Sequence, residues 1–325
     1  MIAIDWGTSS LRGYLLDADG SVLEQRRGSD GILACQGRFA EVLSTLIDGW
    51  DGPVLLSGMI GSRNGWVEQA YLPCPADTAA LAQAMRSYDD LLPGRTLWFV
   101  PGVSTGEQRG VLDASASERH SVPDANTDEQ HGVPDVGTGE RHSVPDVMRG
   151  EETQLVGLIA ALGDGEHVAC LPGTHSKWAQ IANGQLTGFA TVMTGELYAV
   201  LRQHSILGKL MQDDHTELDG DAFLQGVDRS ADPGGLSHHL FGARTLGLFD
   251  RLTATALPSY LSGLLIGHEL REHRGDHGTV HLVGSPALAQ RYALALAHLG
   301  IKTQLHPEDL AATGLFALAS QRGLV

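Results

Sequence analysis

The chain has 325 residues, which suggests about two domains. Hydrophobic residues make up 42% of it and the net charge is −17, so it can form sizeable cores but repels the phosphates of a nucleic acid. No window approaches the roughly 18 uncharged apolar residues of a membrane span, and the N-terminus lacks the basic and apolar stretches of a secretory signal. Three scattered cysteines argue against a disulfide framework. We therefore expect a cytoplasmic protein that binds neither nucleic acid nor membrane.

The first hundred residues predict alternating strands and helices. Ile2–Ile4, Leu11–Leu16 and Val22–Arg26 form a predicted three-stranded meander, in which Asp19-Gly20 is a dipeptide typical of a hairpin turn. Further along, apolar spacing predicts a helix and then two strands. These elements are Phe39–Ile47, Val54–Leu56 and Thr96–Val100.

The turn between the first two strands is small and polar, and consists of Gly7, Thr8, Ser9 and Ser10. Glycine lets a backbone approach a ligand closely, and successive amides and hydroxyls can surround an anion. The turn is therefore a candidate phosphate site. Asp5, at the end of the first strand, is a candidate to order Mg²⁺ through water.

Residues 105–146 differ from the rest of the chain because they repeat every eleven residues, with copies that start at Glu107, Glu118, Glu129 and Glu140. Prolines in the later copies exclude a continuous helix, and few residues could enter a core. The segment reads as a solvated surface insertion. The alternative is a metal-binding array of His120, His131 and His142, although imidazoles on a loop have no fixed geometry.

A polar cluster, Arg149, Glu151 and Glu152, begins the next predicted helix, where the first half of the chain gives way to the second. Either carboxylate is a candidate to accept a proton from an alcohol in a phosphoryl transfer. The alternative is that acidic residues favour the first turn of a helix because they complement its dipole. The guanidinium of Arg149 suits a substrate carboxylate, or it pairs with a neighbouring acid.

The second half repeats the plan of the first. Another predicted meander has its hairpin turn at Asn183-Gly184, and the turn after its first strand contains Gly173, Thr174 and His175. Such an internal repeat is informative, because two matching corners that face one cleft would hold the β- and γ-phosphates of a nucleotide. The alternative is two ordinary corners in unrelated sheets. The strands are Val168–Leu171, Lys177–Ala182 and Leu186–Val192.

The remainder again alternates helices with strands, which indicates α/β layers. Gly284-Ser285, between a strand and a helix, either packs against a flat nucleoside or forms an ordinary loop. The predicted helices lie near 195–210, 238–253 and 258–272, from Pro286 through Leu299, and after Pro307. The predicted strands are Val280–Val283 and Lys302–Leu305.

Five runs taken together resemble the 2-dehydro-3-deoxygalactonokinase family, which belongs to the superfamily of acetate and sugar kinases, heat-shock chaperones and actin. The resemblance runs in order to about Ala319 and is interrupted by residues 105–146. The runs are IDWGTSSLRGYL from Ile4, VMRGEETQLVG from Val147, LPGTHSKW from Leu171, TGEL from Thr194 and LSGLLIG from Leu261.

The resemblance implies an α/β fold in which two ribonuclease-H-like (actin-like ATPase) domains, residues 1–150 and 151–325, flank a nucleotide cleft. It implies that ATP, with Mg²⁺, phosphorylates the 6-hydroxyl of 2-dehydro-3-deoxy-D-galactonate in galactonate breakdown, and that domain closure excludes water. A homodimer is compatible with the resemblance. Two alternatives remain: a kinase of this fold for another sugar acid or polyol, and a chaperone-like or actin-like ATPase that binds a protein.

The resemblance also implies roles for particular residues. Asp5 would act in catalysis and hold Mg²⁺, and Glu151 would be the base, with Glu152 as the second candidate. Arg149 and Arg12 would bind the sugar acid. The residues expected to bind ATP are Gly7, Thr8, Ser9, Ser10, Gly173, Thr174, His175, Lys177, Gly284 and Ser285.

Two of these motifs depart from the family pattern. The second phosphate motif usually carries an acid near its strand end, but here Pro172 and His175 take that place. The adenosine motif at Gly284-Ser285 lacks its usual second glycine.

Overall fold

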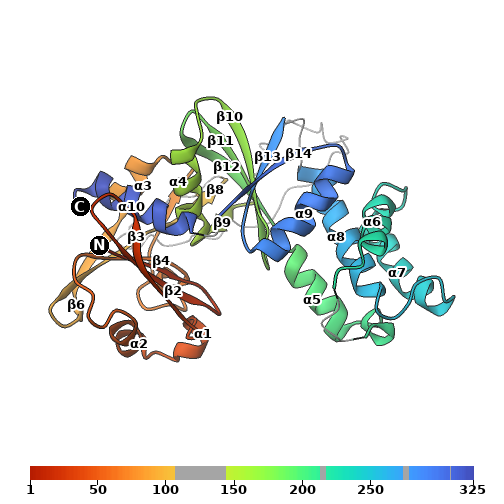
Figure 1. The fold of residues 1–325 in the computed structure, drawn as a ribbon, viewed down its shortest axis with the longest axis horizontal. Helices are drawn as coiled ribbons and strands as arrows, with labels where there is room; N and C mark the ends of the chain where they lie inside the picture. The colour runs from red at the N-terminus through yellow and green to blue at the C-terminus, as the bar shows by residue number, and fades with distance from the viewer. Residues whose placement is uncertain (107–143, 213–216, 274–277, 308) are drawn as a thin grey trace, which may run out of the picture.

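The protein is described by a computed structural model that covers residues 1–106, 144–212, 217–273, 278–307 and 309–325. Its strands form two larger sheets and a small third sheet within these residues. The two larger sheets belong to two lobes, and the labelled chain termini lie close together in the same lobe (Figure 1). None of the described helices is long and apolar enough to cross a lipid bilayer.

The first sheet has the spatial order β3-β2-β1-β4-β7-β6. Its first three strands form the predicted antiparallel meander, and β4 and β7 then run parallel to β1. The hairpin turn falls at the predicted place, where Gly20 has a φ of 86° that favours glycine. The strands are β1 (Ile2–Trp6), β2 (Leu11–Leu16), β3 (Val22–Gly28), β4 (Val54–Gly58), β6 (Arg86–Leu92) and β7 (Arg95–Phe99).

The second sheet has the order β12-β11-β10-β13-β14, which repeats five strands of the first sheet. Again three antiparallel strands are followed by two that run parallel to the first. Asn183 and Gly184 form the second hairpin turn, with φ of 50° and 77°. The internal repeat predicted from the sequence is therefore confirmed. The strands are β10 (Glu166–Leu171), β11 (Ser176–Ala182), β12 (Gln185–Val192), β13 (Thr279–Val283) and β14 (Lys302–His306).

Helices cover both faces of each sheet, which is the expected α/β layering. One apolar core lies between β1, β4 and the pair α1 and α2, and another lies between β10, β13 and the pair α8 and α9. A third core joins the two halves, because it contains residues of both sheets together with α3, α4 and α10. These helices are α1 (Ile32–Cys35), α2 (Phe39–Leu46), α3 (Thr78–Ala84), α4 (Glu151–Ala161), α8 (Leu257–His273), α9 (Pro286–His298) and α10 (Leu310–Arg322).

Two glycines let α4 and α10 cross closely between the halves. A Cβ atom on Gly314 would lie 1.8 Å from the carbonyl oxygen of Thr153, and one on Gly157 would lie 2.2 Å from that of Leu310. The C-terminal helix α10 also packs on α3 and β1 of the first lobe. This close crossing fixes the position of α4, whose first turn carries the candidate base. The division into domains at residue 150 stays a prediction.

The remaining helices lie beyond the second sheet, at the far end of that lobe (Figure 1). The predicted helices near 195–210 and 238–253 correspond to α5 and α7, and α6 was missed. Their bounds are α5 (Thr194–His204), α6 (Gly220–Arg229) and α7 (Gly235–Leu248). Two short 3₁₀ turns are Met59–Gly61 and Gly208–Leu210.

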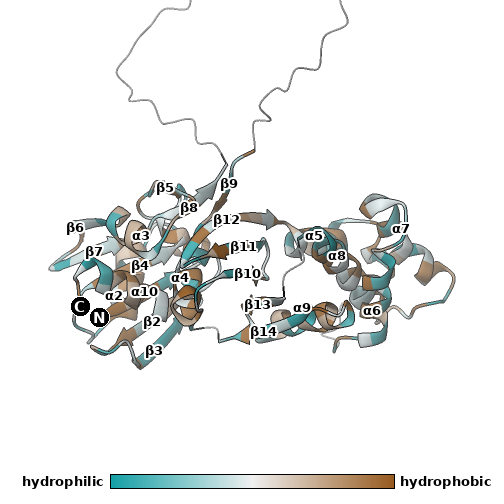
Figure 2. Ribbon diagram, turned by 90° about the horizontal axis from the view of Figure 1, so that it is seen from above, coloured by the Kyte–Doolittle hydropathy of each residue, from teal (hydrophilic) through white to brown (hydrophobic). Residues whose placement is uncertain are grey.

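The predicted insertion begins and ends in the small third sheet, which consists of β5 (Tyr71–Pro73), β8 (Gly102–Thr105) and β9 (Asp146–Met148). Figure 2 shows this sheet beside β12. Thr105 pairs with Asp146, and the Asp146 carboxylate accepts a hydrogen bond of 2.6 Å from the backbone amide of Thr191. The boundaries 105 and 146 were therefore too wide, because both residues belong to the fold. His120, His131 and His142 lie outside the described residues.

We expect that replacing residues 107–143 with a short Gly/Ser turn leaves melting temperature and turnover nearly unchanged. The physical reason is that β8 and β9 are antiparallel neighbours, so a short connection can join them. Thermal unfolding and steady-state kinetics of the shortened chain check this. A large loss of either would give the segment a structural or functional role.

Candidate active site

The two predicted phosphate corners line a single cleft of about 460 Å³. Thirteen of the predicted site residues contribute to its wall, from both halves of the chain. The alternative of two unrelated corners is therefore excluded by their position. The residues are Asp5, Gly7, Thr8, Ser9, Ser10, Arg12, Arg149, Glu151, Gly173, Thr174, His175, Gly284 and Ser285.

The first corner is held in shape by its own backbone and by α1. The amide of Gly7 donates a 2.9 Å hydrogen bond to the carbonyl of Ser10, and the amide of Ile32 donates one of 3.1 Å to the carbonyl of Gly7. Gly31 must be small here, because a Cβ atom would lie 2.4 Å from the carbonyl oxygen of Thr8. The corner is thus preorganised before any ligand binds.

Asp5, the penultimate residue of β1, lies beside this corner and pairs in register with Arg12 on β2. Burial raises the pKa of Asp5 to about 6, although the nearby Arg12 lowers it, and Glu151 raises it further. A cation at this carboxylate would favour its charged form. Within the described residues no group of three or more ligating side chains could hold a metal. A single carboxylate therefore fits Mg²⁺, which keeps several waters and binds substrate phosphates, better than an ion that needs a protein cage.

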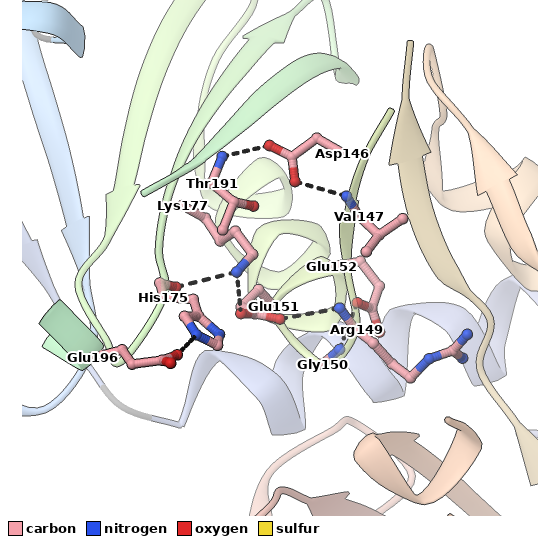
Figure 3. A network of polar contacts seen from close by, with 10 residues as sticks. All are labelled: Asp146, Val147, Arg149, Gly150, Glu151, Glu152, His175, Lys177, Thr191 and Glu196. Carbon is pink, nitrogen blue, oxygen red and sulfur yellow. Dashed lines mark hydrogen bonds and ion pairs between the residues drawn. The ribbon is translucent and has the colours of Figure 1, made fainter. Parts of the chain in front are cut away.

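Glu151 begins α4 after Gly150, whose φ is 110° and whose added Cβ atom would lie 3.2 Å from Cα of Gly58. One carboxylate oxygen of Glu151 accepts a hydrogen bond of 3.2 Å from the amide of Arg149. The other lies 3.2 Å from Nζ of Lys177, and 29% of the side chain is exposed (Figure 3). Gln154, three residues further on, lines the same cleft. The i, i+3 spacing could have identified it.

Glu152, the second candidate base, does not line the cleft and is only 1% exposed. One of its oxygens accepts a hydrogen bond of 2.6 Å from the amide of Gly150, and the other has no hydrogen-bond partner in the part of the chain that the structure describes. Burial, and then the charge of Glu151, raises the pKa of Glu152 to about 8. The expected catalytic role of Glu152 is therefore not supported by its position, and Glu151 is the carboxylate that faces the cleft.

Arg149 lines the cleft but is 93% buried. Its Nη2 donates a hydrogen bond of 2.7 Å to the carbonyl of Gln69, and its Cζ lies 4.4 Å from the ring centroid of Tyr71. Its Nε and Nη1 are buried and have no hydrogen-bond partner among the described residues. Two such nitrogens are costly unless a ligand or water satisfies them. The buried guanidinium therefore keeps two donors for an acceptor that reaches it.

The second corner is completed by a residue that the sequence analysis did not assign, Glu196 in the first turn of α5. Its amide donates a 2.9 Å hydrogen bond to the carbonyl of Thr174, and its carboxylate pairs with Nε2 of His175. The second phosphate motif lacks the usual acid near its strand end. Glu196, which is 21 residues beyond His175 in the sequence, places a carboxylate beside it. The sequence did contain a signal for Glu196, because this residue is part of the run TGEL on which the family resemblance rests.

Lys177 was expected to bind ATP, but it does not line the cleft. Its ammonium group is buried between Glu151 and the carbonyl of His175. At the third predicted motif, a Cβ atom on Gly284 would lie 3.3 Å from the carbonyl of Pro172, so this turn packs on the second corner. Ser285 precedes α9, and Leu288 of α9 also lines the cleft.

Two duplicated α/β halves place matching corners around one cleft, an arrangement that suits an enzyme that binds phosphate groups. The family model of 2-keto-3-deoxy-galactonokinase matches residues 5–318. The chain belongs to the 2-keto-3-deoxy-galactonokinase family, and it is a phosphotransferase with an alcohol group as acceptor.

The similarity to individual relatives extends along nearly the whole chain. The "probable 2-dehydro-3-deoxygalactonokinase DgoK1" of Rhizobium meliloti (strain 1021) is 34% identical over 328 residues, which cover 98% of this chain and 95% of the relative. The 2-dehydro-3-deoxygalactonokinase of Escherichia coli (strain K12) is 31% identical, with 92% and 90% covered. A crystal structure of a Sinorhizobium meliloti protein of the same description superposes with a TM-score of 0.80, at 32% identity, covering 98% and 97% of the two chains.

Proposed function

We propose that this chain transfers the γ-phosphoryl group of ATP to the 6-hydroxyl of 2-dehydro-3-deoxy-D-galactonate, in galactonate breakdown. The observation that carries the proposal is one cleft lined by both phosphate corners, by Glu151 and by Arg149. The two curated relatives, whose names specify this kinase, support the choice of sugar acid.

The two corners would hold the phosphates of ATP from opposite sides of the cleft. Backbone amides and hydroxyls in Gly7–Ser10 and Gly173-Thr174 suit an anion because they form concave donor sites. The contact between His175 and Glu196 keeps the imidazole at the second corner. Phosphoryl transfer depends mostly on positioning and electrostatics, so this rigid arrangement supplies much of what the reaction needs.

Glu151 would accept the proton of the substrate hydroxyl. As that oxygen bonds to the γ-phosphorus, the bond between the phosphorus and the ADP oxygen breaks, and the products are ADP and the 6-phosphorylated acid. The first turn of α4 places Glu151 and Gln154 on the side that lines the cleft. Asp5 would hold Mg²⁺, which when bound neutralises charge on the phosphates.

Arg149 would bind the C1 carboxylate at the other end of the acid. In Figure 3 its guanidinium points away from Glu151, so the proposal assigns the two ends of the acid to different side chains. Its two unpartnered nitrogens match the need of a carboxylate for strong donors. Arg12 lines the cleft beside Asp5, and its predicted contact with substrate stays a prediction.

ADP release, measured with a panel of acceptors, tests the proposal. The expected result is turnover with 2-dehydro-3-deoxy-D-galactonate, much slower turnover with neutral polyols, and none that depends on added protein clients. Preference for another sugar acid would retain the kinase and change the substrate. ADP release stimulated only by a protein would contradict the proposal and favour a chaperone-like ATPase.

A further inference from the structure

Lys177 is an unusual residue because it is a lysine with only 4% of its surface exposed. It lies on β11, directly after the second phosphate corner. Side chains alternate between the two faces of a strand. Ser176 therefore points to Tyr292 on one face, with 3.0 Å between the two oxygens, while Lys177 points to α4 on the other. The strand thus delivers one cation to the first turn of α4.

The buried ammonium has two partners, which lie in different parts of the site. Nζ lies 3.2 Å from Oε1 of Glu151 and donates a hydrogen bond of 3.1 Å to the carbonyl of His175 (Figure 3). A buried charge is tolerated only when it is paired and hydrogen-bonded. The pair therefore links the carboxylate of the candidate base to the backbone of the corner that would hold phosphate.

The contacts of Glu151 show what this link would do. Lys177 holds Oε1, and the amide of Arg149 donates to Oε2, so both oxygens are fixed from the protein side. A carboxylate has about four lone-pair sites, so each oxygen keeps a lone pair for a hydroxyl proton. An unheld glutamate on a helix end would sample several rotamers, few of which face the substrate.

We propose that Lys177 is a positioning residue that holds the carboxylate of Glu151 in register with the second phosphate corner, and that it does not itself bind ATP. The inference rests on the proposed function, in which Glu151 is the base. Its physical support is that Lys177 is absent from the lining of the cleft, whereas Gly173 and His175 on the same corner line it.

The test is a double-mutant cycle with Lys177→Met, Glu151→Gln and the combined variant. Methionine keeps the length and apolar stem of the buried side chain, and Lys177→Arg keeps the charge. Lys302→Met removes an exposed lysine on β14 and serves as the matched control. For each variant we would measure kcat, KM for both substrates, the dissociation constant of ADP and the melting temperature.

Lys177→Met is expected to lower kcat by roughly tenfold or more while KM for ATP and ADP affinity change less than about twofold. The combined variant should be as slow as Glu151→Gln alone, because Lys177 acts through that carboxylate. Lys177→Arg should recover part of kcat, and Lys302→Met should behave as the parent chain.

Two results would overturn the inference. A rise in the ATP KM and weaker ADP binding in Lys177→Met, with losses that multiply in the combined variant, would make Lys177 a phosphate ligand. A lower melting temperature with unchanged kcat would make it purely structural. Normal turnover of Glu151→Gln would instead contradict the proposed base, which is a separate outcome.

Discussion

Glu151→Gln is expected to lower turnover by about 10²-fold or more, with little change in nucleotide affinity. Glutamine has the shape of glutamate and keeps an acceptor oxygen, but it cannot take up the hydroxyl proton at neutral pH. The amide oxygen of glutamine can still accept a hydrogen bond from Lys177, so the second phosphate corner should keep its shape and ATP should still bind. Steady-state kinetics and calorimetric titration with ADP measure the two quantities separately.

Glu152→Gln provides the matched control one residue further along α4. Glu152 is buried outside the cleft, and its raised pKa keeps it mostly neutral at pH 7. Glutamine can still accept the hydrogen bond from Gly150, so turnover should stay within a few-fold of the parent. Equal losses in both variants, or near-normal turnover of Glu151→Gln, would contradict the assignment of the base.

The repeated sheet could be predicted from the sequence because its hairpin turns and strands are each indicated by neighbouring residues. Asp19-Gly20 and Asn183-Gly184 are dipeptides that tolerate the positive φ of a hairpin turn, which Gly20, Asn183 and Gly184 adopt, and alternating apolar residues on either side favour strands. Two such hairpins in the same order implied a duplicated plan, which the strand orders of both sheets confirm. The crossing of α4 and α10 could not be predicted, because it depends on Gly157 meeting a helix that lies far along the chain.

The missed helix α6 carried helical signals that the sequence analysis passed over. Its buried positions are spaced as on one face of a helix, and Ala222 and Gly226 lie where α8 packs closely. These positions are Ala222, Phe223, Gly226 and Val227. A cap was also present, since the Asp219 side chain accepts a 3.0 Å hydrogen bond from the amide of Ala222. Capping residues would have located the start of this helix.

The corners at Gly7, Gly173 and Gly284 are far apart in sequence and line one cleft as predicted, whereas two side-chain contacts beside them were not foreseen. Glu196 reaches His175 only because α5 packs on the second corner. Lys177 was expected to face phosphate, whereas strand alternation directs it to Glu151. A corner motif indicates where a ligand would lie, but the direction of each side chain depends on the register of the strand that follows.

Arg149→Met is expected to lower kcat/KM for the sugar acid by on the order of 10²-fold, mainly through KM, because losing one partner of a buried charge pair costs several kcal/mol. Methionine preserves the apolar stem over Tyr71. The matched comparison is the same substrate with its C1 carboxylate converted to an amide. In the parent chain the acid should be strongly preferred to the amide.

In Arg149→Met that preference should nearly disappear, because kcat/KM falls for the acid and changes little for the amide. This ratio separates recognition from stability: a variant that merely folds less well loses activity equally with both substrates. Arg149→Lys should recover only part of the preference, since an ammonium group lacks the planar guanidinium that matches a carboxylate. A preserved ratio in Arg149→Met would place the carboxylate elsewhere, and Arg12, which also lines the cleft, would be the next residue to test.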